Sequence, residues 1–174
     1  MPKTQVSIGL INPKSPTNVG AVLRAAGCFR ADSIFYTGTR YDRAMRYSTD
    51  TSKGVKNISL KGVESLLHHK KVDAKIICVE LVEDATPLHH FKHPDNAYYI
   101  FGPEDGSINQ QTIDQADDVV YIPTNGCMNL AATVNVVLYD RLIKSKDLIT
   151  NNELIKKNKD INSRIKIKNL KQAN

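Results

Sequence analysis

The sequence lacks the long apolar runs that mark membrane and secreted proteins. Its 174 residues contain no apolar stretch close to the ~18 residues that a membrane span requires. The first residues, MPKTQVSIGLINPK, have no charged region followed by a long apolar core, so they predict no signal peptide. We therefore expect a cytoplasmic protein with no membrane partner.

Cysteine is scarce, and the patterns of common metal and nucleotide sites are missing. Cys28, Cys78 and Cys127 are far apart and without CxxC spacing, which argues against a disulfide framework and for a reducing compartment. The five histidines follow no HExxH pattern, so we expect them in solvated helix ends and loops and expect no metal. No GxGxxG or Walker A pattern follows the first predicted strand, so the sequence lacks the phosphate-binding loops of the usual dinucleotide-binding and P-loop proteins.

Net charge is low over most of the chain. The total is +6, but residues 153–174 hold seven Lys or Arg against two acids, a net of +5, which leaves +1 for residues 1–152. We divide the chain into a domain over 1–150 and a basic polar tail over 151–174. The tail is either disordered or a salt-sensitive aid to phosphate binding.

Predicted strands and helices alternate along the domain. Strands are expected over 6–11, 33–37, 57–59, 74–81, 97–101 and 119–122. Helices are expected over 17–29, 60–70, 109–116 and 128–143, with 40–47 as a loop or short helix. This alternation predicts an α/β domain whose mostly parallel sheet carries helices on both faces. Ligands of such sheets bind beyond the carboxyl ends of the strands, which directs attention to the loops there.

Two of these loops combine glycine with a few polar side chains. Residues 12–29 (NPKSPTNVGAVLRAAGCF) place Asn18 at a helix start and Arg24 as the only charge between Asn18 and Phe29, which is also compatible with an ordinary amphipathic helix. Residues 100–108 (IFGPEDGSI) place Glu104 between two glycines that permit close backbone approach to a ligand. Taken alone, this second segment is also compatible with a plain turn.

The third loop leads into a helix with few charges. Residues 121–140 (YIPTNGCMNLAATVNVVLYD) have apolar side chains on more than one helix face, which indicates burial in the core or against a second subunit. Asn129 and Thr133 are one turn apart and share a face. Cys127 is either a small buried hydrophobe or part of the site.

The three segments together resemble the motifs of the SpoU/TrmH branch of the SPOUT RNA 2'-O-ribose methyltransferases. NVGAVLRAAGCF resembles motif one, FGPEDG motif two and IPTNGCMNLAATVNVVLYD motif three, and the resemblance covers about residues 5–143. It implies an α/β fold with a C-terminal trefoil knot and a homodimer with the active site at the interface. It also implies S-adenosylmethionine as donor and a ribose 2'-hydroxyl of tRNA or rRNA as acceptor.

The resemblance also assigns roles to residues at matched positions. Asn18 and Arg24 would lie near the target ribose and phosphate, Glu104 would order the site, and Asn129 would fix the arginine or the donor. Donor-binding positions would be Val79, Gly102, Ile122, Cys127 and Leu130. Two positions depart from the family pattern, because Cys127 and Ala131 stand where serines are expected, and motif two is one residue shorter than the common spacing.

A cluster of basic and aromatic residues follows the second strand and is predicted to contact RNA. Arginines suit phosphates and tyrosines stack on exposed bases, and the alternative is a solvated surface loop. The predicted RNA contacts are Arg40, Tyr41, Arg43, Arg46, Tyr47 and Lys53. The single domain favours tRNA over rRNA by analogy with small relatives.

Two other functions compete with the enzyme. One is a non-catalytic RNA-binding protein of the same fold, marked by the change from serine to cysteine. The other is an unrelated α/β domain that binds a nucleotide or another small molecule.

Overall fold

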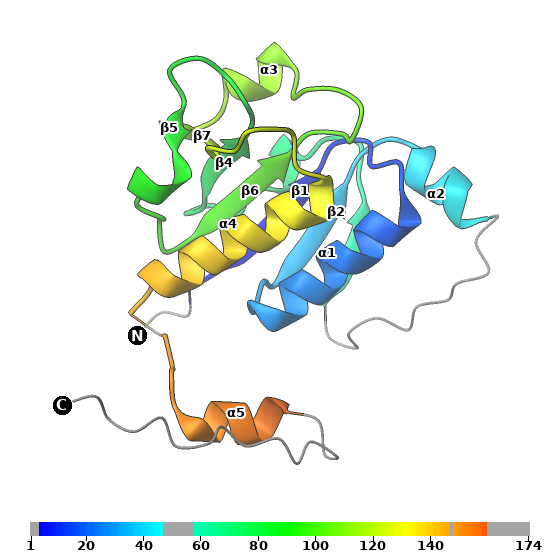
Figure 1. Ribbon diagram of the computed structural model, residues 1–174. Coiled ribbons are helices and arrows are strands. Elements are labelled where there is room, and N and C mark those ends of the chain that lie inside the picture. The colour runs from blue at the N-terminus through cyan, green and yellow to red at the C-terminus, as the bar shows by residue number, and fades with distance from the viewer. Residues whose placement is uncertain (1–3, 47–57, 147, 160–174) are drawn as a thin grey trace.

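A single parallel sheet forms the centre of the molecule (Figure 1). The computed structural model describes residues 4–46, 58–146 and 148–159. The described strands are paired in the order β3-β2-β1-β6-β4-β7-β5, and every pairing between them is parallel. Their bounds are Val6–Leu10 (β1), Ser33–Tyr36 (β2), Ser59–Gly62 (β3), Lys75–Val79 (β4), Thr86–Pro87 (β5), Ala97–Phe101 (β6) and Asp118–Tyr121 (β7).

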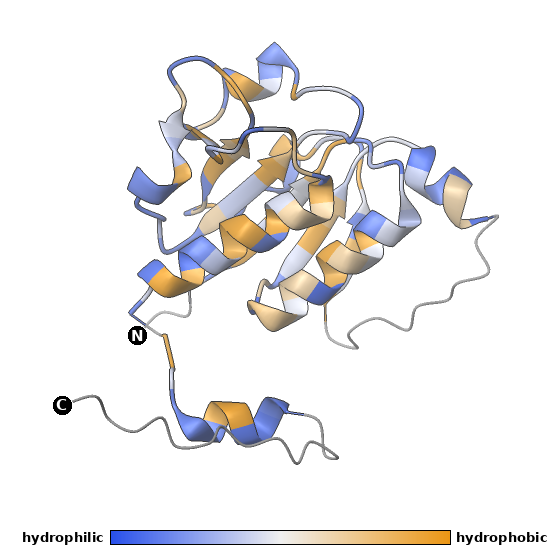
Figure 2. Ribbon diagram, in the orientation of Figure 1, coloured by the Kyte–Doolittle hydropathy of each residue, from blue (hydrophilic) through white to orange (hydrophobic). Residues whose placement is uncertain are grey.

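Two long helices lie side by side on one face of this sheet, α1 (Pro16–Cys28) and α4 (Leu130–Lys144) (Figure 1). Apolar residues concentrate in these helices and in the central strands (Figure 2). Every residue of β1 and β6 is buried, as expected for central parallel strands covered on both sides. The α/β class and the parallel sheet predicted from the sequence are therefore confirmed.

The opposite face of the sheet has a thinner cover than predicted. A second apolar cluster there includes Leu66, Ile76, Tyr98 and Ile108. It is contributed by the strands, by loops, and by the segments around the 3-10 turn η1 (Leu67–His69) and the short helix α3 (Gln110–Ile113). Short turns, rather than long helices, thus close this side of the core.

The helix predicted over 60–70 is wrong. Residues Ser59–Gly62 instead form β3, which pairs with β2, and only η1 is helical in that segment. Val63, Leu66 and Leu67 have helical spacing, but Leu66 is buried in the core, Val63 packs against the core from an irregular segment, and Leu67 packs against it from η1. Pairing with a neighbouring strand therefore overrides the local pattern.

The remaining helices are short, and two of them fall where the sequence analysis left alternatives open. Helix α2 covers Arg40–Met45, so the basic segment after β2 begins as a helix. Helix α5 covers Asn152–Asn158 within the predicted tail, and the rest of the tail from 160 lies outside the described residues. The domain boundary near 150 stays a prediction. None of the described helices is long and apolar enough to cross a membrane.

A buried polar network holds the C-terminal half of α4 against the segment before β6. His93 is hydrogen-bonded through Nδ1 to the Tyr99 hydroxyl (2.6 Å) and through Nε2 to Asp140 (2.8 Å). Arg141 donates to the carbonyls of Pro94 and Asp95. Burial lowers the pKa of His93 despite the nearby Asp140 carboxylate. These bonds fix α4, whose first turn borders the cavity described below.

Tyr98 differs from its neighbour Tyr99, because its buried hydroxyl has no hydrogen-bond partner among the described residues. An unpaired buried hydroxyl costs free energy that a phenyl ring does not. We expect Tyr98→Phe to raise the free energy of unfolding by about 1 kcal/mol in urea denaturation. Tyr99→Phe is the matched control and should lower it, since the Tyr99 hydroxyl bonds to His93 and Arg141. A loss of stability in Tyr98→Phe would contradict this assignment.

Candidate active site

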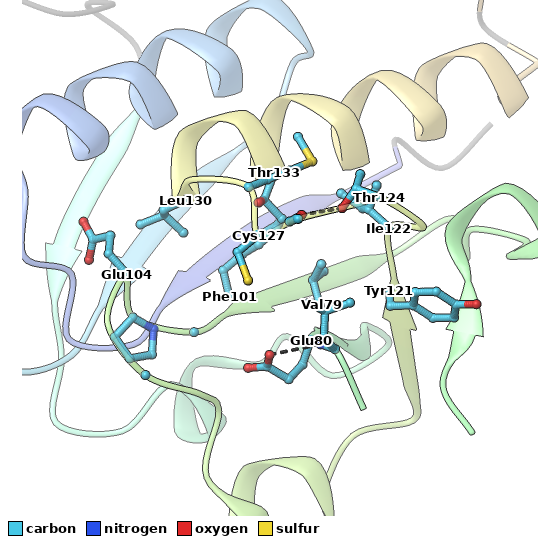
Figure 3. A pocket seen from close by; sticks show the side chains of 16 residues that line it. Val79, Glu80, Phe101, Glu104, Tyr121, Ile122, Thr124, Cys127, Leu130 and Thr133 are labelled. Carbon is cyan, nitrogen blue, oxygen red and sulfur yellow. Dashed lines mark hydrogen bonds between the residues drawn. The ribbon is translucent and has the colours of Figure 1, made fainter. Parts of the chain in front are cut away.

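The three predicted loops follow β1, β6 and β7, whose carboxyl ends lie at one edge of the parallel sheet. The loops after β6 and β7, together with the end of β4, enclose a cavity of about 190 Å³ (Figure 3). The first turn of α4 also contributes, through Leu130 and Thr133. The cavity therefore occupies the position in which α/β sheets bind their ligands.

All five residues predicted to bind the donor line this cavity: Val79, Gly102, Ile122, Cys127 and Leu130. Val79, Ile122 and Leu130 give it apolar walls. A Cβ atom added to Gly102 would lie 3.2 Å from the Glu80 carboxylate, so a larger residue would crowd this wall. Apolar walls combined with exposed backbone suit a flat, partly apolar ligand such as a nucleoside.

Glu104 joins the second loop to the first. One carboxylate oxygen accepts a hydrogen bond from the backbone N–H of Lys14 (2.9 Å), and the other accepts from the Ser15 N–H and the Asn18 amide (3.1 Å each). Burial alone would raise the pKa of Glu104, but these hydrogen bonds together hold its pKa below the usual value. Glu104 is therefore an anion that fixes the entry to α1, and it also lines the cavity.

Arg24 projects from the exposed side of α1. Within the described residues it makes no hydrogen bond or ion pair, and it is not among the residues that line the cavity. Gly20 and Ala21 lie one turn before it and Gly27 and Cys28 one turn after it, so its helical neighbours are small. Its guanidinium is available to a ligand that approaches over α1.

Asn129 is the N-cap of α4. Its side-chain oxygen accepts a hydrogen bond from the backbone N–H of Ala132 (2.8 Å), and its carbonyl accepts from the Thr133 hydroxyl (2.9 Å). The residue is exposed, which leaves its amide NH₂ available to a ligand. The cap orients the first turn of α4 toward the cavity. Asn129 therefore has a structural task beside the role that the family resemblance implies.

Glu80 lines the cavity and is a residue that sequence analysis missed. Its carboxylate accepts a hydrogen bond from the backbone N–H of Ile108 (2.8 Å) and another from that of Leu81 (3.0 Å). Figure 3 shows the Glu80 carboxylate at the cavity. Through these bonds Glu80 ties the end of β4 to the loop after β6. Its place directly after the buried run 76–79, at the carboxyl end of a strand, was the available signal. Met128, Thr124 and Tyr121 also line the cavity and were missed.

The predicted RNA-contact cluster is only partly available to a partner. Arg43 and Arg46 are exposed, and within the described residues they form no ion pair. Tyr41 is half-buried and packs edge-on against Tyr36, with ring centroids 5.1 Å apart. Arg40 is turned toward Asp105. The predicted contacts Tyr47 and Lys53 lie outside the described residues.

The described residues contain no group of three or more histidine, cysteine or acidic side chains placed to hold a metal ion. Cys127 is an exposed free thiol at the cavity, Cys28 is exposed on α1, and Cys78 is buried. Burial raises the pKa of the Cys78 thiol to about 12. Cys78 is therefore a neutral core residue.

The fold and cavity define an α/β protein with a cavity at the carboxyl edge of a parallel sheet. A family model described as the SpoU rRNA Methylase family matches residues 5–139. The chain belongs to this family.

Individual relatives are more distant. The 23S rRNA (guanosine-2'-O-)-methyltransferase RlmB of Acinetobacter baylyi is 25% identical over 134 residues, which cover 72% of this chain and 54% of that protein. The chain therefore spans about half the length of this curated relative. A structure from work on the 2-OH methylation of C/U34 on tRNA is 18% identical with a TM-score of 0.65, covering 82% of this chain and 97% of the other.

A second solved structure was determined with a bound cofactor. The SpoU methyltransferase AviRb of Streptomyces viridochromogenes, in complex with AdoMet, is 17% identical with a TM-score of 0.64. It covers 81% of this chain and 58% of AviRb. At these identities the two structures establish a shared fold.

Proposed function

We propose that the protein transfers a methyl group from S-adenosylmethionine to a ribose 2'-hydroxyl of RNA. The observation that carries the proposal is the junction of motifs one and two, where Glu104 holds Asn18 beside a cavity lined by all five predicted donor residues. Family membership supports the reaction class, and the AdoMet complex of AviRb supports the donor.

The cavity suits the proposed donor. Its apolar walls fit an adenosine, with Val79, Ile122 and Leu130 as the apolar contacts, and Gly102 keeps its wall free of a side chain. The sulfonium of S-adenosylmethionine supplies an already activated methyl group, so the proposal includes no metal. What the chain must add is alignment of the acceptor oxygen and a place for its proton.

Arg24 is proposed to bind the phosphate next to the target ribose and to stabilise the developing alkoxide. The alternative role for this residue is general base. Arginine keeps its proton to a pH above ~12, which makes a base role physically awkward. In our proposal Arg24 therefore stays charged, and phosphate or water takes the proton.

Cys127 replaces the serine that the family pattern has at this position. A thiol is a weaker hydrogen-bond donor than a hydroxyl, and Cys127 is exposed at the cavity. We expect Cys127→Ser to keep turnover within roughly threefold of the parent, because both side chains are small and have similar shape. Single-turnover methylation assays measure this, with Cys28→Ser as the control. Abolished activity would show that the thiol has a specific task.

The proposed acceptor is tRNA rather than rRNA. A solved structure concerned with the 2-OH methylation of C/U34 on tRNA shares this fold, with a TM-score of 0.65, and supports this choice. The exposed Arg43 and Arg46 supply phosphate contacts at the end of α2, and the basic residues after 153 add salt-dependent affinity.

We further propose a homodimer and a C-terminal knot, as the resemblance implies. Exposed apolar side chains on α4 support the dimer, since Tyr139 is 57% and Ile143 43% exposed. After β7, which lies next to the edge strand β5, the chain turns back to α4, which packs against α1 (Figure 1). This return toward the centre of the sheet is compatible with a knotted path. Light scattering should give the mass of two chains, and an experimental structure traced through 100–144 tests the knot.

Mass spectrometry of ribose methylation tests the central proposal. Total tRNA and rRNA from cells with and without the protein are compared, and the purified protein is then incubated with the RNA that differs. We expect one 2'-O-methyl group to be lost from tRNA and restored by protein plus S-adenosylmethionine. A change confined to rRNA would overturn the choice of acceptor, and no change in either would overturn the activity.

A non-catalytic RNA-binding protein is the second candidate, and Cys127 and Ala131 in place of serines favour it. Calorimetry with S-adenosylmethionine, followed by a methylation assay, separates the two functions. The enzyme should bind S-adenosylmethionine and methylate RNA, whereas the second candidate should bind RNA without transferring a methyl group.

A further inference from the structure

Arg40 is held by two loops of the candidate site. Its Nη1 atom donates to both carboxylate oxygens of Asp105, at 2.8 and 2.9 Å, and its Nε and Nη2 atoms both donate to the carbonyl of Asn12. A guanidinium has five N–H donors, and these contacts engage at least three of them, one on each nitrogen. The Arg40 side chain is 29% exposed. Little of the Arg40 side chain is therefore left to bind an outside ligand.

The two partners of Arg40 belong to the segments that Glu104 also joins. Asn12 lies two residues after β1 and has a φ of 42°, in the left-handed region. Lys14 and Ser15 follow closely and donate their backbone N–H groups to Glu104. Asp105 follows Glu104 directly. Residues 12–15 are therefore held from two sides, by Glu104 at one end and by Arg40 at the other.

We infer that Arg40 is a positioning residue, which holds the loop after β6 against the loop after β1 and so places Asn18 and Glu104. The inference rests on the proposed function for its catalytic consequence. Arg40 reaches the site from α2, so the helix that presents Arg43 and Arg46 to RNA is tied to the loop that borders the cavity.

The electrostatics of the pair are consistent with this role. The hydrogen bonds from Arg40 hold the pKa of Asp105 below its usual value despite some desolvation, and Lys14 lies 3.7 Å from the same carboxylate. Asp105 therefore stays ionised well into the acid range. An RNA phosphate would have to displace this carboxylate to take Arg40, whereas Arg43 and Arg46 are exposed and free of ion pairs within the described residues.

A positioning role and a phosphate-binding role for Arg40 predict opposite effects of changing its partner Asp105. If Arg40 positions the loops, Arg40→Ala and Asp105→Asn both lower kcat by roughly tenfold with little change in the KM for RNA. The double variant is then no worse than either single one. If Arg40 binds a phosphate, Arg40→Ala weakens RNA binding and reduces its salt dependence, while Asp105→Asn strengthens RNA binding and leaves kcat unchanged.

Arg40→Lys separates the roles again. Lysine keeps the charge but lacks the planar fork, so a positioning role predicts that it fails to rescue kcat, and a phosphate role predicts that it keeps most of the RNA affinity. Arg43→Ala is the matched control from the same helix. It should weaken RNA binding and reduce its salt dependence, which is the pattern that a phosphate contact gives.

Amide hydrogen exchange tests the positioning independently of activity. In the intact chain without RNA, Arg40→Ala and Asp105→Asn should each speed exchange at the backbone N–H groups of Lys14 and Ser15 by about tenfold, and Arg43→Ala should not. Unchanged exchange in both variants would overturn the inference. Faster exchange in a protein that methylates no RNA would keep the structural role and overturn only the proposed function.

Discussion

Replacing Arg24 with alanine is expected to lower the rate of RNA methylation by at least ~100-fold, which is typical of losing a donor that stabilises developing negative charge. Donor binding should be nearly unchanged, because Arg24 lies outside the cavity that Val79, Ile122 and Leu130 line. Single-turnover assays at saturating RNA measure the rate, and calorimetry with S-adenosylmethionine measures donor binding. Loss of donor binding would overturn this role.

Lys71→Ala is the matched control for Arg24→Ala. Lys71 is an exposed cation near the amino end of β4, at the opposite edge of the sheet from the cavity. Removing it changes the net charge by the same amount as Arg24→Ala. Methylation by Lys71→Ala should stay near that of the parent, which would show that the loss in Arg24→Ala depends on position.

Arg24→Lys distinguishes a phosphate clamp from a base. Lysine has a pKa near ~10.4 and releases a proton more readily than arginine, so a base role predicts activity that is kept and a pH profile that moves. A clamp role predicts a lower rate with an unchanged pH profile, since the guanidinium binds phosphate through a planar fork and an ammonium does not.

The sequence predicted the central sheet better than its edges. The apolar run 97–101 became β6 with the predicted bounds, because a strand buried on both faces needs apolar residues throughout. The helix predicted over 60–70 failed because β3 gains its hydrogen bonds from β2, which lies far earlier in the chain. Local spacing contains no information about such a partner.

The same distinction applies to the candidate site. The family resemblance allowed five donor-binding residues to be proposed together. Four of them stand in motifs two and three, and the fifth, Val79, lies at the end of a neighbouring strand: Val79, Gly102, Ile122, Cys127 and Leu130. The pairing of Arg40 with Asp105 could not be proposed, because 65 residues separate the two and the residue types alone fit solvent, phosphate or each other. Glu80 was missed for a related reason, since its partner Ile108 contributes a backbone N–H that every residue but proline has.

Glu104→Gln is expected to lower the methylation rate by roughly 10- to 100-fold, because small displacements of positioned groups are costly. The carboxylate receives three hydrogen bonds, from the N–H groups of Lys14 and Ser15 and from the Asn18 amide. Glutamine has only one acceptor oxygen, so its NH₂ group must face at least one of these donors. Asn18 and the start of α1 should therefore shift.

The pH dependence of stability tests the role of the ionised Glu104 carboxylate independently of turnover. The folded-state pKa lies below the usual value, so its contribution to stability is complete above the unfolded pKa and is lost as pH falls through the folded one. We expect Glu104→Gln to be about 1 kcal/mol less stable than the parent at neutral pH in urea denaturation. The difference should shrink as pH falls through the folded-state pKa of Glu104 and vanish at acid pH below it, where both side chains are neutral. Glu83→Gln removes an exposed carboxylate and should match the parent at both pH values. A Glu104→Gln protein with full turnover and parental stability at neutral pH would show that the junction of motifs one and two does not depend on this anion. The pairing of Arg40 with Asp105 would then be the contact that positions the two loops.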